Sequence, residues 1–191
     1  WKIWLIAARL VQNQGHRDDA RLCIERSCME VPLKQISICL LEYAKYFEMI
    51  GENERALDIM QRVRTQSNAE WKIQFEAVMM YMRMGKFKDA EKIVKESLKS
   101  YFAKGRLWAV LIQLQHQRAC TQQDFQEVHN TFKQAVNEIS KSGEVWCEGA
   151  RLCLTNHPSN PFFDVHMALK YLDFAVQFTP QYGDSFLEVI R

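Results

Sequence analysis

Cys153, His157 and His166 are the side chains whose types and spacing come nearest to a metal site in this sequence. Thiolate and imidazole groups bind zinc, but a structural zinc site needs four ligands at a recognised spacing. The Cys153-x-x-x-His157 pattern matches no common zinc finger, and a fourth ligand is missing. We therefore expect no metal site and no other cofactor.

Nucleophilic and phosphate-transfer chemistry also lack their usual motifs. The chain contains no Gly-x-Ser-x-Gly elbow, no Walker loop and no dinucleotide-binding fingerprint. Its six cysteines include no Cys-x-x-Cys pair, and a chain of 191 residues that is 48% hydrophobic can bury a core without disulfides. We predict a protein that is not an enzyme and whose thiols are reduced, small and buried.

Side chains suited to binding recur along one face of successive predicted helices. Seven of them are basic, against two acidic ones, Glu48 and Glu144, and such a face would attract an acidic partner. The alternative is that long Lys and Arg side chains merely solvate a helix face. A Met-containing apolar stripe on the same face suits a partner helix, or else packs into the core. The predicted partner-binding face is Lys2, Arg9, Lys45, Lys72, Phe75, Met79, Met82, Arg83, Arg106, Gln113 and Arg151.

Such a face requires regularly spaced helices, and the sequence repeats a helical hairpin. In the second helix of each hairpin, a small or modest residue recurs at steps of 36, 34, 38 and 40 residues. An apolar residue follows four positions later and another small or modest one seven positions later, which places all three on one helical stripe. Small residues on that stripe let two helix backbones approach closely. The recurring positions are Ala20, Ala56, Ala90, Val128 and Ala168.

The first helices of the hairpins align as well. Their packing positions are Ala8, Ala44, Val78, Ile112 and Ala150. In the first three hairpins, the first helix ends at a glycine, which tolerates the left-handed conformation that turns the chain. The last two have longer loops instead, with Asp124 and Asp164 as predicted N-caps. The predicted helices span about 1–14, 17–31, 36–50, 53–66, 70–84, 87–101, 105–119, 124–140, 143–154 and 164–178.

These elements predict one all-α repeat domain over residues 1–191, a solenoid in which each hairpin packs on its neighbours. Both ends fall inside helical patterns, so we expect a piece of a longer chain. The predicted repeats span about 1–35, 36–69, 70–104, 105–142 and 143–180, with a partial sixth at 181–191.

Three segments resemble the tetratricopeptide (TPR) superfamily and its half-a-TPR (HAT) branch. Ala20-Arg-x-x-x-Glu-Arg-Ser27 resembles the second HAT helix, and Tyr43-Ala-Lys-Tyr-Phe-Glu48 resembles the first. Trp146-x-x-x-Ala-Arg-Leu152 resembles the opening of repeats in splicing factors. The resemblance implies a right-handed superhelical solenoid of about five TPR/HAT hairpins plus the start of a sixth. It also implies that the first helices line a concave surface.

The resemblance further implies a non-catalytic scaffold for protein–protein interaction in a multi-subunit assembly. An RNA-processing complex, of the pre-mRNA splicing or 3′-end processing type, fits the HAT features best. Two alternatives stay open: a TPR scaffold or adaptor of a cytoskeletal, ciliary or organellar complex, and a regulatory solenoid attached to a catalytic domain outside this segment. We expect an intracellular protein, nuclear or cytoplasmic, with a cytoskeletal or ciliary location left open.

The expected partners are other proteins, with an acidic or amphipathic helical segment in the concave groove, and neighbouring repeats of the same chain. The formal net charge is only +2, and uncharged and acidic residues interrupt the basic series, so direct RNA binding should be weak or absent. No apolar run approaches the roughly 20 residues that a membrane-spanning helix needs. We therefore expect no membrane association.

Overall fold

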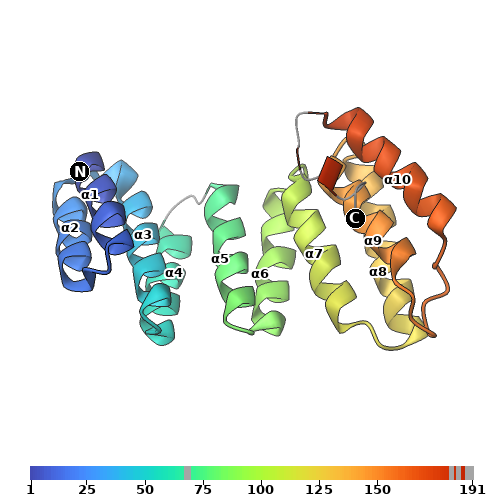
Figure 1. The fold of residues 1–191 in the computed structure, drawn as a ribbon, viewed down its shortest axis with the longest axis horizontal. Helices are drawn as coiled ribbons and strands as arrows, with labels where there is room; N and C mark the ends of the chain where they lie inside the picture. Colours follow the sequence, from blue (N-terminus) through green and yellow to red (C-terminus); the bar gives the residue numbers. More distant parts are fainter. Residues whose placement is uncertain (67–69, 181–182, 184–185, 188–191) are drawn as a thin grey trace. The chain divides into compact units, whose positions relative to one another are not determined.

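Helical hairpins follow one another along the chain, as Figure 1 shows. The computed structural model describes residues 1–66, 70–180, 183 and 186–187. These residues form ten α-helices and one short 3-10 helix, and none of them lies in a strand. The predicted all-α architecture is confirmed, and the helix bounds agree with the predicted ones to within two residues. The chain divides into two compact units, Trp1–Lys86 and Phe87–Arg191, which are described separately.

The N-terminal unit contains the first two hairpins and the first helix of the third. Helices that are consecutive in the sequence pack on each other, from α1 against α2 through to α4 against α5. This is the neighbour-to-neighbour packing that the repeat pattern predicts. The elements are α1 (Lys2–Asn13), α2 (Arg17–Glu30), the 3-10 helix η1 (Leu33–Gln35), α3 (Ile36–Met49), α4 (Asn53–Gln66) and α5 (Trp71–Arg83).

The C-terminal unit begins with the second helix of the third predicted hairpin. Its helices also pack in sequence order, and α7 additionally packs against α9, so that two first helices meet directly. The elements are α6 (Phe87–Ser100), α7 (Gly105–Arg118), α8 (Gln122–Glu138), α9 (Gly143–Leu154) and α10 (Val165–Phe178).

The predicted packing stripe is buried in both units. The recurring small residues of the second helices, Ala20, Ala56, Ala90, Val128 and Ala168, are at most 1% exposed. The packing positions of the first helices, Ala8, Ala44, Val78, Ile112 and Ala150, are at most 2% exposed. The residues four and seven positions after the second-helix series are buried too. Within each unit, burial of these side chains holds neighbouring helices together.

Glycines make the tight turns of the first three hairpins, as predicted. Gly15, Gly51 and Gly85 have φ values of +86°, +85° and +72°, which side chains with a Cβ rarely adopt. After α1, the His16 amide donates to the carbonyl of Val11, which satisfies one of the last carbonyls of the helix. The turn therefore reverses the chain within three residues.

The two later hairpins begin their second helices with polar caps. Asp164 is the N-cap of α10, as predicted, and its carboxylate accepts a hydrogen bond from the Met167 amide. The prediction that Asp124 is the N-cap of α8 is wrong. Thr121 is the N-cap, and Asp124 completes a capping box by accepting a hydrogen bond from the Thr121 amide. The box satisfies two amides at the helix start, so α8 begins earlier than predicted.

The loop before α10 is held by a buried asparagine. The side-chain amide of Asn160 donates to the backbone carbonyls of Leu152 and Thr155 at 2.8 and 2.9 Å.

The predicted start of a sixth hairpin at 181–191 lies largely outside the described residues. Within the described part of the chain, no helix combines the length and the apolar character that crossing a bilayer requires.

Candidate protein-binding face

The three first helices of the N-terminal unit carry the charged residues of its predicted inner face. Arg9 lies on α1, Lys45 on α3 and Arg83 on α5, and all three belong to the predicted binding face. Each of them contacts a carboxylate on a neighbouring first helix. The acidic members are Glu42, Glu48 and Glu76.

Two arginines hold their carboxylates in a two-point arrangement. Arg9 donates from Nη2 to Glu42 Oε1 at 2.9 Å and from Nε to Oε2 at 3.1 Å. Arg83 donates from Nε to Glu48 Oε1 at 2.6 Å and from Nη2 to Oε2 at 2.8 Å. The hydrogen bond that Arg9 donates to Glu42 raises the pKa of Arg9, and the one that Arg83 donates to Glu48 raises the pKa of Arg83. Such paired contacts fix side-chain orientation as well as charge.

Lys45 and Glu76 connect these two pairs into one ion-pair network. Lys45 Nζ lies 3.5 Å from Glu76 Oε1 and 3.9 Å from Glu42 Oε1. Glu76 Oε1 also lies 3.5 Å from Arg83 Nη2. The network, defined as Arg9, Glu42, Lys45, Glu48, Glu76 and Arg83, therefore contains as many carboxylates as cations and runs from α1 through α3 to α5.

Two of these acids, Glu42 and Glu76, are not among the residues predicted for the inner face of this unit, whereas Glu48 is. A signal for them exists, because Glu42 and Glu76 are 34 residues apart, about one repeat, and therefore occupy equivalent positions on α3 and α5. The centre of this face is thus charge-balanced. The remaining predicted basic residues of this unit, Lys2 and Lys72, lie outside the network.

The predicted apolar stripe lies on α5. Phe75, Met79 and Met82 are each partly exposed, whereas Val78 and Ala77 on the same helix are fully buried. Phe75 packs edge-on against the Trp71 ring with 6.5 Å between centroids. The stripe is therefore partly accessible to a partner.

In the C-terminal unit the predicted residues lie on α7 and α9. Arg106 Nε lies 3.5 Å from Glu144 Oε1, and Arg151 pairs with Glu148 on its own helix. Gln113 lies partly exposed on α7. Here too the basic side chains contact acidic ones, and one of these, Glu144, was already placed on this face by the sequence.

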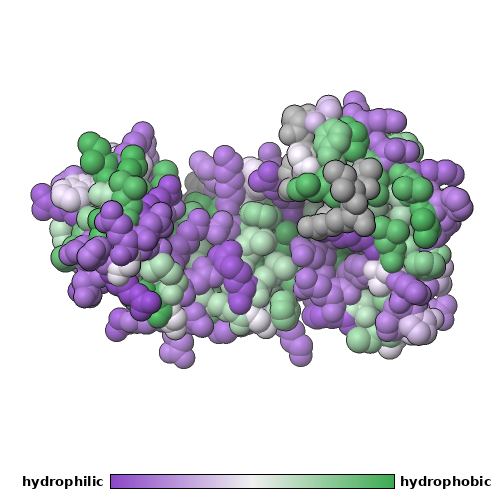
Figure 2. All heavy atoms as spheres, in the orientation of Figure 1, coloured by the Kyte–Doolittle hydropathy of each residue, from purple (hydrophilic) through white to green (hydrophobic). Residues whose placement is uncertain are grey.

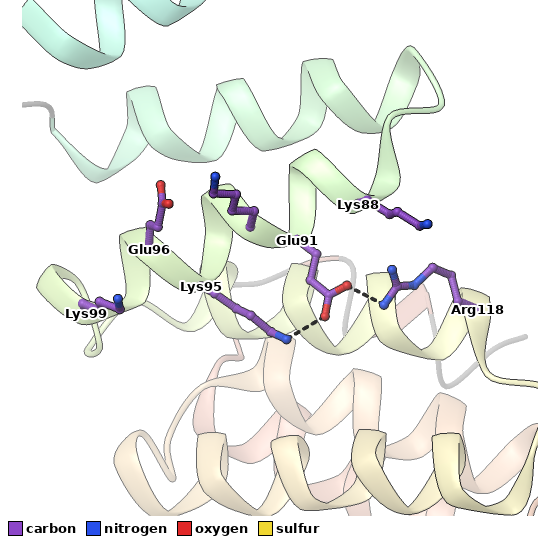
Figure 3. Close-up of a pocket in the computed structure, with 7 residues that line it drawn as sticks. Lys88, Glu91, Lys95, Glu96, Lys99 and Arg118 are labelled. Carbon is purple, nitrogen blue, oxygen red and sulfur yellow. Dashed lines mark ion pairs between the residues drawn. The ribbon is translucent and has the colours of Figure 1, made fainter.

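A lysine-rich face of α6 was not singled out from the sequence. Lys88, Lys92, Lys95 and Lys99 follow one another at helical spacing and line a shallow pocket with Glu91, Glu96 and Arg118. Figure 3 shows Glu91 between Lys95 and Arg118, with an ion pair to each. Burial alone would raise the pKa of Glu91, but the hydrogen bond and charge of Lys95, together with Arg118, lower it overall.

Apolar side chains are exposed along α1. Ile3, Ile6 and Leu10 are 80%, 59% and 60% exposed and share one helical stripe, opposite the buried Leu5 and Ala8. Figure 2 shows hydrophobic residues at the surface over this helix, while hydrophilic residues dominate most of the view. One apolar side of α1 packs into the core, and the other is exposed and could contact another protein surface.

The cysteine and histidine residues considered for metal binding do not assemble a ligand set. No group of three potential ligands lies together among residues 1–66 and 70–180 and the three further described positions. Cys153 is buried against α10, and burial raises the pKa of its thiol to about 11. His157 lies in the loop after α9, where its ring packs 5.4 Å from that of Phe125.

Helices that pack in sequence order, with mostly small residues buried at the recurring positions and glycines at the first three turns, define a TPR-type α-solenoid, a class of repeat that binds proteins. The chain matches the family described as PRP6, TPR-like domain over residues 1–191, and it belongs to this family. The resemblance drawn from the sequence is thereby confirmed.

Known relatives agree with this assignment. A TPR-containing protein of Dictyostelium discoideum is 42% identical over 133 residues, a match that covers 70% of this chain and 9% of that protein. The C-terminal part of a TPR repeat-containing protein from Cytophaga hutchinsonii superposes with a TM-score of 0.65 at 14% identity, covering 98% of this chain and 72% of that one. A TPR protein of Thermus thermophilus gives 0.59 at 17% identity, covering 97% and 95%. These two structures establish the shared fold alone.

Proposed function

We propose that this chain is a non-catalytic scaffold segment that holds protein subunits together in a nuclear RNA-processing assembly of the pre-mRNA splicing type. The observation that carries the proposal is the match to the PRP6, TPR-like domain family along all 191 residues, because PRP6 is a splicing factor. That match favours a splicing assembly over a cytoskeletal, ciliary or organellar one. The match covers 9% of the length of the Dictyostelium relative.

The contact surface in this proposal is the inner face of the first helices. In the N-terminal unit it combines the ion-pair network with the partly exposed Phe75, Met79 and Met82. In the C-terminal unit it comprises Arg106, Gln113 and Arg151. Polar groups that are already oriented by their partners, next to adaptable apolar side chains, suit recognition of a protein helix or strand.

The proposal is tested by purifying the tagged parent protein from nuclear extract, with nuclease treatment, and identifying bound proteins by mass spectrometry. Subunits of a splicing complex should be recovered, and they should persist after the RNA is digested. Recovery of a cytoskeletal or organellar assembly instead, or complete loss of partners on nuclease treatment, would contradict the proposal.

The role of the inner face is tested by the double variant Lys45→Glu/Arg83→Glu. It should recover less partner protein while the helices remain folded by circular dichroism. The matched control is Arg55→Glu/Arg62→Glu on α4, since both arginines are exposed and lie outside the network. Their ion pairs are with Glu52 and Asp58, and the Arg55 guanidinium also lies over the Phe47 ring, 5.8 Å from its centroid. Equal losses in both variants would mean that the inner face has no special role.

A further inference from the structure

A groove lies at the N-terminal ends of the first helices in the N-terminal unit, away from the ion-pair network. It has a volume of about 770 Å³, and it is lined by residues from the N-terminal ends of α1, α3 and α5, by the turn between α2 and α3, and by Val63 of α4. No member of the ion-pair network lines it. We call it the lysine-rimmed groove, and the residues used in the argument are Lys2, Lys34, Lys72, Leu33, Ile38 and Leu41.

The groove exposes apolar side chains to water. Leu33 is 86% exposed because it lies in the short 3-10 turn that follows Pro32, and Ile38 on the first turn of α3 is 46% exposed. Leu41 lies one helical turn further along α3 and is partly buried. Exposed aliphatic groups next to a concavity are a source of binding free energy when a partner covers them.

The rim of the groove is positively charged, unlike the network. Lys2, Lys34 and Lys72 make no ion pair with any residue that the structure describes, whereas Glu70 is the one carboxylate among the described lining residues. Three helices also begin here, and none of α1, α3 and α5 has a side-chain cap. Their free amides add to the positive potential.

We propose that the lysine-rimmed groove binds a segment of a partner protein in which acidic side chains alternate with apolar ones. The carboxylates would lie against Lys2, Lys34 and Lys72, and the apolar side chains would cover Leu33 and Ile38. The inference rests on the proposed scaffold function, since it specifies the chemistry of one of the partners.

A protein segment fits these features better than single-stranded RNA does. RNA binding needs a longer track of cations and aromatic faces on which bases stack. The groove offers three lysines and an aliphatic floor, and the Trp1 ring that lines it is already covered by Lys2, whose Nζ lies 5.5 Å from the ring centroid.

The test uses the full 191-residue chain and a labelled peptide in which Asp-Leu-Glu-Phe is repeated three times, followed by fluorescence anisotropy. Binding should be detectable in about 0.05 M salt and should weaken several-fold in about 0.3 M salt, because the lysines are exposed. Two comparison peptides carry Lys in place of the acids or Ser in place of the apolar residues, and both should bind much more weakly.

Variants of the chain locate the binding. Lys34→Glu/Lys72→Glu should reduce affinity for the acidic peptide by about tenfold or more, since two attractive contacts become repulsive. Leu33→Ser should reduce the affinity for the acidic peptide by a few-fold. It should also reduce the difference in affinity between this peptide and the one that carries Ser in place of the apolar residues. The control Arg55→Glu/Lys86→Glu makes the same charge change at exposed sites of this unit that do not line the groove. Lys34 and Lys72 lack ion pairs, and a carboxylate in the first turn of a helix is favourable, so their variant should unfold at a urea midpoint no lower than that of the parent.

Three results would overturn the inference: equal binding of the acidic and basic peptides, equal losses in the groove variant and its control, or single-stranded RNA displacing the peptide. If the peptide fails to bind but the parent protein still recovers splicing subunits, the inference falls and the proposed function stands. If the peptide binds as expected but no splicing subunit is recovered, the groove stands and the proposed assembly is wrong.

Discussion

Gly149, in the middle of α9, gives the sharpest test of how the C-terminal unit is packed. Helix propensity alone predicts that Gly149→Ala stabilises the protein, because alanine is better than glycine inside a helix by about 0.8–1 kcal/mol. The structure predicts the opposite. A Cβ at this position would lie 2.4 Å from both Cε2 and Cζ of Phe132 on α8, far inside van der Waals contact.

The Phe132 ring has little room to move away. Its side chain is 3% exposed and its ring packs against Trp146 and Tyr171, with centroid distances of 5.8 and 5.2 Å. Overpacking a core of this kind costs about 1–3 kcal/mol. After subtracting the gain in helix propensity of about 1 kcal/mol, Gly149→Ala should destabilise the protein by about 0–2 kcal/mol.

Urea unfolding followed by circular dichroism measures this change, and the variant Phe132→Leu provides the control. Leucine lacks the two ring atoms that come closest to the added Cβ. In the Phe132→Leu background, Gly149→Ala should therefore be neutral or stabilising by up to about 1 kcal/mol, so the sign of its effect changes. If Gly149→Ala raises the urea midpoint equally in both backgrounds, the packing described for α8 and α9 is wrong.

Four further measurements test the same structure. Ala56 and Ala90 are fully buried, so Leu at either site should overpack the core, lower the urea midpoint and cost about 1–3 kcal/mol, and an unchanged midpoint would contradict their burial. Glu48→Gln removes a carboxylate from a partly exposed pair with Arg83 and should cost only about 0.5 kcal/mol, less at high salt; a salt-independent loss would show that charge is not the cause. Burial and a neighbouring arginine lower the pKa of His116 from 6.5, so the folded state disfavours its protonation. Stability should therefore fall as the pH drops below about 6.5, and His116→Gln should flatten part of that slope in urea titrations at several pH values. Single-stranded RNA should bind at about 10⁻⁴ M or weaker at physiological salt, and sub-micromolar, sequence-selective anisotropy titrations would refute this.

The helices and their buried faces could be read from the sequence because both depend on local periodicity. Ala20, Ala56 and Ala90 recur at nearly constant steps, and each step is set by two helices and their turns. The start of α8 was misjudged although its signal was present, since Thr121 and Asp124 have the spacing of a capping box. A search for that pattern would have placed the helix start correctly.

The charge of the binding face was harder to predict, because it depends on which side chains of different hairpins meet. Lys45 on α3 pairs with Glu76 on α5. Glu42, also on α3, pairs with Arg9 on α1. The predicted charge of the face was taken from selected positions of each first helix, and Glu42 and Glu76 lie beside those positions. The lysine-rimmed groove was missed for a related reason, since Lys34 belongs to a turn rather than to any helix face.

The ion-pair network and the lysine-rimmed groove differ in what their mutation can reveal. In the N-terminal unit the closely packed helices are consecutive ones, so α1 and α3 are joined chiefly through α2, and α3 and α5 through α4. The network adds direct links between these first helices, through Arg9 to Glu42 and through Arg83 to Glu48. Reversing a charge there changes both the stacking of hairpins and any partner contact, and a loss of binding must be compared with a loss of stability. Lys34 and Lys72 carry no such link, so reversing them changes the charge offered to a partner while leaving the hairpins joined.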